Sequence, residues 1–254
     1  MKKEGEPIII VEGLTARYGD ETILEDVSFQ VRRGEVFVVV GGSGCGKSTL
    51  LKHMIGLHRP AAGKVVIEGV EITAEDQTGI DEVRKEIGVL FQSSALFGSM
   101  SLAENVALPL REYTDLPSPA IDLIVRMKLG MVNLAGYENH LPSEISGGMK
   151  KRAALARAMA LDPEILFFDE PSAGLDPVTS AELDRLIHRI NEGMGTTMVV
   201  VTHELDSIFN IAHRVIMLDK SERGIIAEGD PHDLRDHSTD PRVASFFHRR
   251  PQTD

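Results

Sequence analysis

The sequence has 254 residues, of which 42% are hydrophobic and 26% charged, and this composition excludes intrinsic disorder and a collagen-like fibre. Its 39 acidic and 27 basic residues give a formal net charge of −12, which argues against binding along a nucleic-acid backbone, so no nucleic-acid partner is expected. The apolar runs are shorter than the roughly 18 residues that span a bilayer, and no charged-then-apolar leader opens the chain. Because the single cysteine, Cys45, fits a reducing compartment, we expect a cytosolic globular protein.

Apolar runs rich in β-branched residues, each followed by glycine or polar residues, predict the strands of the fold. In the first part of the chain they lie at 8–11, 27–31, 36–40 and 65–67, and a helical pattern follows the third run at 50–57. Further strands are predicted at 165–168, 197–201 and 215–218, with helices at 181–190 and 205–211 between them. This alternation is typical of an α/β fold with a parallel sheet.

The middle of the chain, from about 94 to 161, has a different pattern: helical periodicity dominates and β-branched runs are scarce. We expect one domain over 1–254, with an α/β core at about 1–93 and 162–236 and an inserted helical subdomain at about 94–161. A polar tail over 237–254 carries an apolar stripe, formed by Val243, Phe246 and Phe247 at i, i+3, i+4 spacing.

A glycine-rich segment lies between the third predicted strand and the helix after it. It matches the phosphate-loop pattern G-x-x-x-x-G-K-[ST], in which backbone N–H groups converge on an anion. Lys47 would reach the β- and γ-phosphates and the Ser48 hydroxyl would ligate Mg²⁺. The alternative, a glycine-rich turn with an exposed lysine, would have to produce the motif in frame with both flanking elements. The predicted phosphate-binding residues are Gly41, Gly42, Ser43, Gly44, Cys45, Gly46, Lys47, Ser48 and Thr49.

Two acids follow the apolar run at 165–168. At the carboxyl edge of a parallel sheet, Asp169 would bind Mg²⁺ through water and Glu170 would polarise the water that attacks the γ-phosphate. Without a phosphate loop in the same chain, such a pair after a strand would be interpreted as a solvated turn. The phosphate loop favours the chemical interpretation. Cys45, within that loop, is expected to be a small tolerated residue rather than a reactive thiol.

A second glycine pair opens a helical pattern in the middle of the chain. Ser146 is placed as an N-cap, and Gly147 and Gly148 occupy the first turn, where each glycine costs around 1 kcal/mol relative to alanine. Close approach of a phosphate to bare N–H groups would explain both glycines. The basic residues after them, Lys150 to Arg152, would then face that anion rather than oppose the helix dipole. The alternative is a solvated basic face on a glycine-capped helix.

With these segments in this order, the chain resembles the nucleotide-binding subunits of ATP-binding-cassette (ABC) transporters along nearly its whole length. Tyr18 resembles the aromatic that stacks on adenine, and Gln92 the glutamine that joins Mg²⁺ and contacts the permease. Asp176 ends a segment resembling the loop that faces the opposite subunit, and His203 resembles the histidine that senses the γ-phosphate. Taken singly, Tyr18 is an ordinary surface aromatic, Gln92 a strand-end amide and His203 a neighbour of a helix cap.

The resemblance implies a P-loop ATPase fold with a mainly parallel sheet, an N-terminal antiparallel β part and an inserted helical subdomain. It implies ATP and Mg²⁺ as ligands and a homodimer in which the signature segment of one chain covers the phosphate loop of the other. The implied catalytic residues are Glu170, His203 and Lys47. The implied nucleotide ligands are the loop 41–49, Tyr18, Gln92, Ser146, Gly147, Gly148 and Asp176, and the metal ligands are Ser48, Gln92 and Asp169.

Within the family, the chain is similar to the ATPases of lipid transporters that work with mammalian-cell-entry (MCE) proteins, the maintenance-of-lipid-asymmetry (Mla) type. Most members have leucine and glutamine where this chain has Ile145 and Met149, and SGGM before a basic pair resembles that type. So do residues 91–112 and 240–247. The resemblance implies phospholipid transport, with the chain bound to a permease on the cytoplasmic side of the bacterial inner membrane.

Its implied partners include an MCE-domain protein and a small STAS-type subunit. The tail would reach either that small subunit or a neighbouring ATPase chain. The alternative for the tail is docking on its own domain. The alternatives for function are the ATPase of another small-molecule importer, with Met149 and the other similarities as drift, and a soluble ABC protein of DNA repair, translation or cluster assembly.

Overall fold

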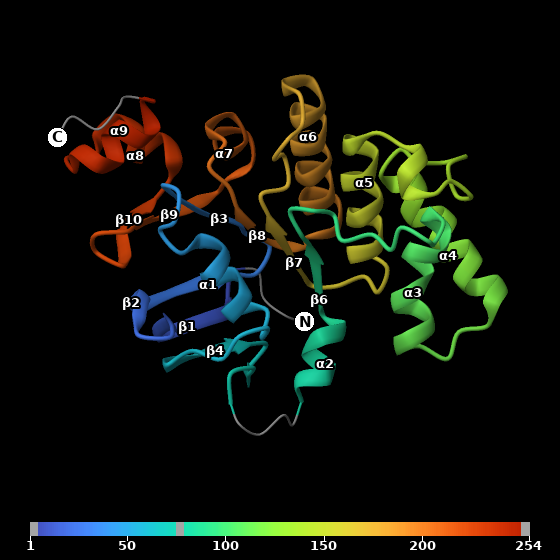
Figure 1. The fold of residues 1–254 in the computed structure, drawn as a ribbon, viewed down its shortest axis with the longest axis horizontal. Coiled ribbons are helices and arrows are strands. Elements are labelled where there is room, and N and C mark those ends of the chain that lie inside the picture. Colours follow the sequence, from blue (N-terminus) through green and yellow to red (C-terminus); the bar gives the residue numbers. More distant parts are fainter. Residues whose placement is uncertain (1–4, 75–78, 250–254) are drawn as a thin grey trace.

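The computed structural model describes residues 5–74 and 79–249, which form two β-sheets and a set of helices (Figure 1). The smaller sheet has the strand order β2-β1-β4-β5, and every neighbouring pair in it is antiparallel. A tight turn at Gly19, with φ of +58°, joins its first two strands. The strands are β1 (Pro7–Tyr18), β2 (Glu21–Arg32), β4 (Ala62–Ile67) and β5 (Val70–Glu71).

The larger sheet has the order β10-β9-β3-β8-β7-β6, in which β9, β3, β8, β7 and β6 run parallel and β10 is antiparallel to β9. Every residue of its central strand β3 is buried, as expected of a parallel strand covered on both faces. The predicted mainly parallel core and N-terminal antiparallel part are therefore confirmed. The strands are β3 (Val36–Gly41), β6 (Ile87–Leu90), β7 (Ile165–Asp169), β8 (Thr197–Val201), β9 (Arg214–Asp219) and β10 (Gly224–Gly229).

Helices cover the larger sheet and extend beyond its β6 edge (Figure 1). The helix predicted at 50–57 instead begins at Lys47 and ends at Met54, because Gly56 adopts φ of +71°, and Leu57 is 59% exposed. The helices are α1 (Lys47–Met54), α2 (Ile80–Lys85), α3 (Leu102–Tyr113), α4 (Ser118–Met131), the 3-10 helix η1 (Pro142–Glu144), α5 (Gly147–Ala158), α6 (Pro177–Met194), α7 (Leu205–Ile211), α8 (Pro231–His237) and α9 (Pro241–Phe247).

Residues 94–161 are all described, and they contain α3, α4, η1 and α5 but no strand. These helices group at one side of the molecule, opposite α8 and α9 (Figure 1). Their apolar residues, such as Val106 and Leu155, share one continuous core with Val40 and Phe168 of the larger sheet. The helical stretch is thus packed on the sheet rather than around a core of its own, and its boundaries at 94 and 161 stay a prediction.

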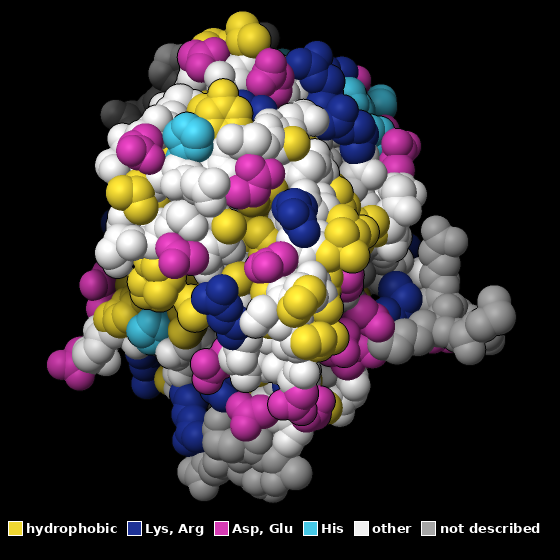
Figure 2. Space-filling view, turned by 90° about the vertical axis from the view of Figure 1, so that its right-hand side faces the viewer, with side chains coloured by type: hydrophobic (Ala, Val, Ile, Leu, Met, Phe, Trp, Pro, Cys, Tyr) yellow, Lys and Arg dark blue, Asp and Glu magenta, His cyan; other side chains and the backbone are white. Residues whose placement is uncertain are grey.

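A second core lies between the two sheets and includes Phe37 of β3, Phe167 of β7, Leu50 of α1 and Ile9 of β1. It fixes the start of α1 against the end of β3, which is where the phosphate loop is predicted. The outer face of the helical stretch carries apolar side chains among charged ones (Figure 2). Within the described residues, no helix is long and apolar enough to cross a membrane.

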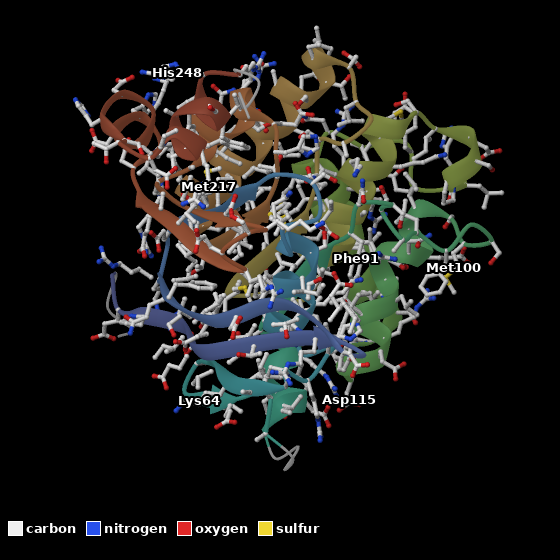
Figure 3. All side chains as sticks on the ribbon, turned by 60° about the vertical axis from the view of Figure 1, so that its left-hand side comes forward. Lys64, Phe91, Met100, Asp115, Met217 and His248 are labelled. Atoms are coloured by element: carbon white, nitrogen blue, oxygen red, sulfur yellow. The ribbon has the colours of Figure 1, made fainter. Side chains whose placement is uncertain are left out.

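The tail forms α9, which packs on the same chain. Val243 is fully buried and Phe247 is 3% exposed, both in the core that covers the larger sheet, and the Phe247 ring lies 5.9 Å from the Phe209 ring of α7. Arg242 pairs with Asp219 at the end of β9, and His248 follows the helix at the outer edge (Figure 3). The self-docking alternative therefore describes this helix, while residues 250–254 lie outside the described residues.

Candidate active site

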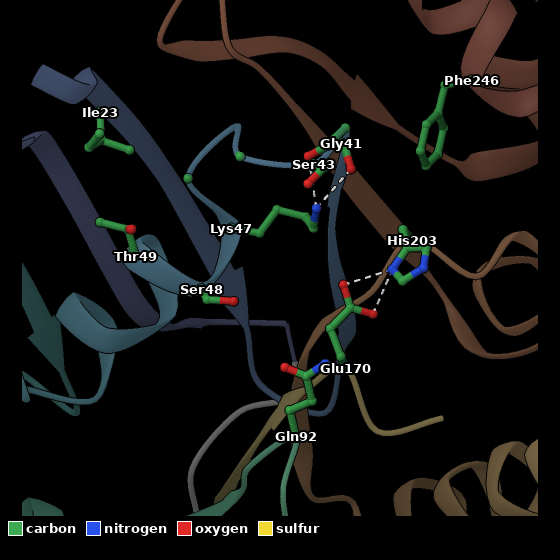
Figure 4. Close-up of a pocket in the computed structure, with 13 residues that line it drawn as sticks. Ile23, Gly41, Ser43, Lys47, Ser48, Thr49, Gln92, Glu170, His203 and Phe246 are labelled. Carbon is green, nitrogen blue, oxygen red and sulfur yellow. Dashed lines mark hydrogen bonds and ion pairs between the residues drawn. The ribbon is translucent and has the colours of Figure 1, made fainter. Parts of the chain in front are cut away.

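The phosphate loop curls between the end of β3 at Gly41 and the start of α1 at Lys47. Gly41 has φ of +145°, and a Cβ there would lie 2.4 Å from the Leu218 carbonyl oxygen, so only glycine fits. Gly46 precedes the helix with φ of +102°. Lys47 is 9% exposed, and its Nζ donates to the carbonyls of Gly41 at 2.8 Å and Gly42 at 3.0 Å (Figure 4). The lysine ammonium is thus held above its own loop.

Ser48 and Asp169 meet across the site. The Ser48 hydroxyl donates to Asp169 Oδ1 at 3.0 Å, which places an oxygen from the first turn of α1 beside the carboxylate that ends β7. Mg²⁺ is bound by hydroxyl and carboxylate oxygens. A metal ion held by both the phosphate loop and the acid at the end of β7 would require this pairing.

Glu170 and His203 face the loop from the ends of two neighbouring strands, β7 and β8. His203 Nδ1 lies 2.9 Å from both carboxylate oxygens of Glu170 (Figure 4). Glu170 is 8% exposed and has φ of +46°, and its backbone N–H donates to the Val201 carbonyl at 2.8 Å. The left-handed backbone turns its carboxylate into the site.

A cavity of about 670 Å³ brings most of the predicted residues together. Asp169 joins them through Ser48, and Cys45 lies buried beneath the loop, where burial raises the pKa of its thiol and keeps it protonated. The sequence pattern did not identify Ile23 or Phe246 as part of this wall. The lining residues are Ile23, Gly41, Gly42, Ser43, Gly44, Gly46, Lys47, Ser48, Thr49, Gln92, Glu170, His203 and Phe246.

Besides Cys45 and Asp169, five predicted ligands do not line this cavity: Tyr18, Ser146, Gly147, Gly148 and Asp176. The Tyr18 side chain is 47% exposed and its ring lies edge-on to a histidine ring at 6.1 Å. Asp176 caps α6, accepting from two backbone N–H groups at 3.1 Å, and a hydrogen bond from the Thr179 hydroxyl lowers the pKa of its carboxyl group.

The signature segment begins α5. Ser146 is the N-cap, with its side chain accepting from the Met149 N–H at 3.3 Å, and both Ser146 and Gly147 are exposed. Gly148 is buried, and a Cβ there would lie 2.4 Å from Thr179 Cγ2 of α6. Helix packing within the chain is therefore one reason for the second glycine, in addition to the predicted phosphate contact.

Lys151 departs from the expectation of a basic helix face beside an anion. Its side chain is 5% exposed, and its Nζ donates to the backbone carbonyls of Gln92 at 2.6 Å and Glu170 at 3.3 Å. Burial lowers the pKa of its ammonium group. The signal that would have shown this is spacing, because Gly148, Lys151 and Leu155 fall on one buried stripe at i, i+3, i+7.

Comparison with known proteins places these observations in a family. The model of the ABC transporter family matches residues 24–173. The chain is 42% identical to the intermembrane phospholipid transport system ATP-binding protein MlaF of Haemophilus influenzae, over 94% of this chain and 90% of that protein. It is 44% identical to the probable ribonucleotide transport ATP-binding protein mkl of Mycobacterium tuberculosis, over 97% of this chain and 69% of that protein.

Solved structures agree. A dimeric structure of the bacterial ABC transporter cassette MJ0796 superposes with a TM-score of 0.80 at 31% identity, covering 87% of this chain and 98% of that one. The same cassette has been solved as a dimer bound to ADP and phosphate, at a TM-score of 0.79. The cbiO1 subunit of Clostridium perfringens gives 0.83 at 28% identity, covering 92% of each chain. This chain therefore belongs to the ABC transporter family and is one of its ATP-hydrolysing, nucleotide-binding subunits.

Proposed function

We propose that this chain hydrolyses ATP with Mg²⁺ in the cavity at the phosphate loop, and that hydrolysis drives phospholipid transport at the bacterial inner membrane. The observation that carries the chemistry is the Glu170–His203 pair, which faces Lys47 across one cavity. A carboxylate held by an imidazole opposite a phosphate-binding lysine is the arrangement that water activation beside a γ-phosphate needs.

The residues present fit Mg²⁺ and ATP. Ser48 and Asp169 would hold the ion, with the Gln92 amide as a third oxygen donor, and the phosphates would complete its shell. When bound, the ion neutralises charge on the β- and γ-phosphates. The loop N–H groups and Lys47 bind the phosphates, since Lys47 can exchange its carbonyl acceptors for phosphate oxygens. Glu170 accepts the proton of the attacking water, and Tyr18 stacks on adenine.

A dimer would complete the site. Ser146 and Gly147 are exposed and do not line their own chain's cavity, which supports a site in which the signature segment of one copy, Gly148 included, covers the nucleotide of the other. Asp176, at the start of α6, would then face the partner copy. The related cassette MJ0796 has been solved as a dimer, which supports a dimer of this chain.

The cargo proposal is supported by the 42% identity to MlaF over most of both chains. The partners would be an integral membrane permease, an MCE-domain protein and a small STAS-type subunit, with the chain held on the cytoplasmic side of the membrane. A second candidate is another small-molecule cargo, because mkl, described as a probable ribonucleotide transport protein, is 44% identical. Phospholipid is preferred since the MlaF match spans 90% of its relative and the mkl match 69%.

One paired experiment tests the proposal: tagged wild type and Glu170→Gln are purified both alone and from the native membrane. Glu170→Gln should bind ATP normally but hydrolyse it about 10² to 10⁴ times more slowly, because the general base is lost. With ATP it should elute as a dimer, whereas the ADP-bound chain stays largely monomeric. From membrane, both should bring down a multipass permease and an MCE-domain protein.

Wild-type turnover by Glu170→Gln would refute the catalytic assignment. Copurification of a permease without an MCE-domain protein, and without stimulation of turnover by phospholipid, would favour the second cargo class. Recovery of neither protein would favour a soluble ABC function.

A further inference from the structure

Helix α5, which begins at the signature segment, reaches back to two loops of the catalytic cavity through buried or half-buried basic side chains. Lys151 donates to the backbone carbonyls of Gln92 at 2.6 Å and Glu170 at 3.3 Å. Arg157, two turns further along, donates to the carbonyls of Ala95 at 2.7 Å and Ser94 at 3.1 Å. One helix therefore holds both the Gln92 loop and the catalytic carboxylate's backbone, and we call Lys151 and Arg157 the basic clamp.

The clamped backbone is in a conformation that L residues rarely adopt. Ser94 has φ of +64°, Ala95 of +48° and Glu170 of +46°, and none is a glycine. Left-handed residues of this kind are strained and persist where the surroundings over-determine them. The hydrogen bonds from Lys151 and Arg157 fall on the carbonyls of these three residues and of Gln92.

Burial makes Lys151 a costly choice for a purely structural contact. It is 5% exposed, and its hydrogen bonds within the described ranges go to carbonyls rather than to a carboxylate. The charges of Asp169 and Glu170 favour its ammonium form, but the loss of hydration on burial outweighs them and lowers its pKa. A buried charge whose hydrogen bonds in the described chain end on these two carbonyls points to a role at the loops that it holds.

We propose that Lys151 is a positioning residue for ATP hydrolysis: it fixes the backbone of Gln92 and Glu170 so that their side chains meet the nucleotide together. This inference rests on the proposed roles of Glu170 and Gln92. Because Ser146 caps α5, the clamp also joins the segment that would cover the partner's nucleotide to the catalytic residues of its own chain. Phe91, immediately before Gln92, lies between the sheet and the helical side of the molecule, where this connection runs (Figure 3).

The test compares Lys151→Met, Lys151→Arg and Lys128→Met in the full-length chain. Lys128 is a matched control, since it is also 5% exposed on a helix of the same side but pairs with Asp162 instead. Lys151→Met should lower kcat by about 10²-fold, the usual cost of a misplacement near 1 Å, with the Kd for ATP unchanged. Lys151→Arg, which keeps charge and donors, should retain most of kcat, and Lys128→Met all of it.

Hydrogen exchange supplies a second readout. The amides of Ser94 and Ala173, which donate to the carbonyls of Phe91 and Glu170, should exchange faster in Lys151→Met while the rest of the chain keeps its protection. Uniformly faster exchange with unchanged kcat would mean that Lys151 is only structural and would overturn the proposal. If Lys151→Met does not fold, Lys151→Gln, a shorter neutral donor, replaces it under the same two outcomes.

Glu170→Gln, measured in the same assay, distinguishes failure of the basic clamp from failure of the proposed ATPase function. Loss of turnover in Glu170→Gln with normal turnover in Lys151→Met would refute the basic clamp alone. Normal turnover in Glu170→Gln would refute the proposed function on which it rests.

Discussion

His203 acts on Glu170 in this structure through a single ring nitrogen. An ionised carboxylate only accepts hydrogen bonds, so Nδ1, which lies 2.9 Å from both Glu170 oxygens, carries the proton. In the neutral ring Nε2 is then an acceptor and cannot donate to a γ-phosphate. The expectation that His203 senses the γ-phosphate as a donor therefore requires the ring to turn or to gain a proton, and it stays a prediction.

Amide substitutions separate these two roles of His203. An asparagine amide can reproduce the Nδ1 donor, whereas a glutamine amide reaches the Nε2 position. If His203 works by orienting Glu170, His203→Asn should keep most of kcat while His203→Ala and His203→Gln lose about 10²-fold, the typical cost of one oriented donor. Steady-state phosphate release measures this, with ATP binding as the control. Activity retained in His203→Gln but lost in His203→Asn would assign the role to Nε2 and the γ-phosphate.

Helices α5 and α6 are in close contact at Gly148, and substitutions at Gly148 and Thr179 can tighten or relieve this contact. A Cβ at position 148 would lie 2.4 Å from Thr179 Cγ2, a distance that forces one side chain to move. Gly148→Ala should therefore destabilise the chain by about 1–3 kcal/mol, the usual cost of overpacking. In a Thr179→Ser background the methyl group is gone but the hydroxyl that bonds Asp176 remains. In that background Gly148→Ala should raise the free energy of unfolding by up to about 1 kcal/mol, because alanine has the higher helix propensity.

Urea unfolding of the wild type and the three variants measures the effect of Gly148→Ala on the free energy of unfolding in each background. Equal effects in both backgrounds would exclude this contact. ATPase activity tests separately whether Gly148 is also needed at the partner's nucleotide. If Gly148 is also needed against the partner's nucleotide, the Gly148→Ala/Thr179→Ser chain should be stable but inactive, with Thr179→Ser alone active. An active double variant would leave helix packing as the sole reason for this glycine.

Sequence patterns predict an element well where burial leaves a repeated chemical signature. β3 is buried at every residue, so it appears as a β-branched run, and the phosphate loop follows it in frame. The extent of α1 was predicted less well, because its limits depend on the backbone angles of Gly46 and Gly56. The inward turn of Lys151 was missed since a charged residue on a buried stripe is normally assigned to the surface.

Helix α9 connects the C-terminal end of the described chain to the phosphate loop. Phe246 lines the cavity together with Gly41 and His203, and its ring meets the Phe247 ring edge-on at 5.2 Å. Nearly 200 positions separate Phe246 from the loop, so no local pattern could have shown this contact. The stripe in the tail thus has two roles, with Val243 and Phe247 in the core and Phe246 on the cavity wall.

Two phenylalanine substitutions test this division of the tail. Phe247→Ala should destabilise the chain by about 3–5 kcal/mol, as expected when a buried aromatic is truncated, and deletion of 241–254 should also lower Tm. A tail that reached only a partner would instead leave the Tm of the isolated chain unchanged. Phe246→Ala should change Tm little, because its ring is half-buried at the cavity, but it should raise KM for ATP. Thermal unfolding and ATPase kinetics on the same preparations give both quantities. Should the deletion leave Tm unchanged and abolish assembly with the permease instead, α9 would be a partner-binding element whose contact with its own core contributes little.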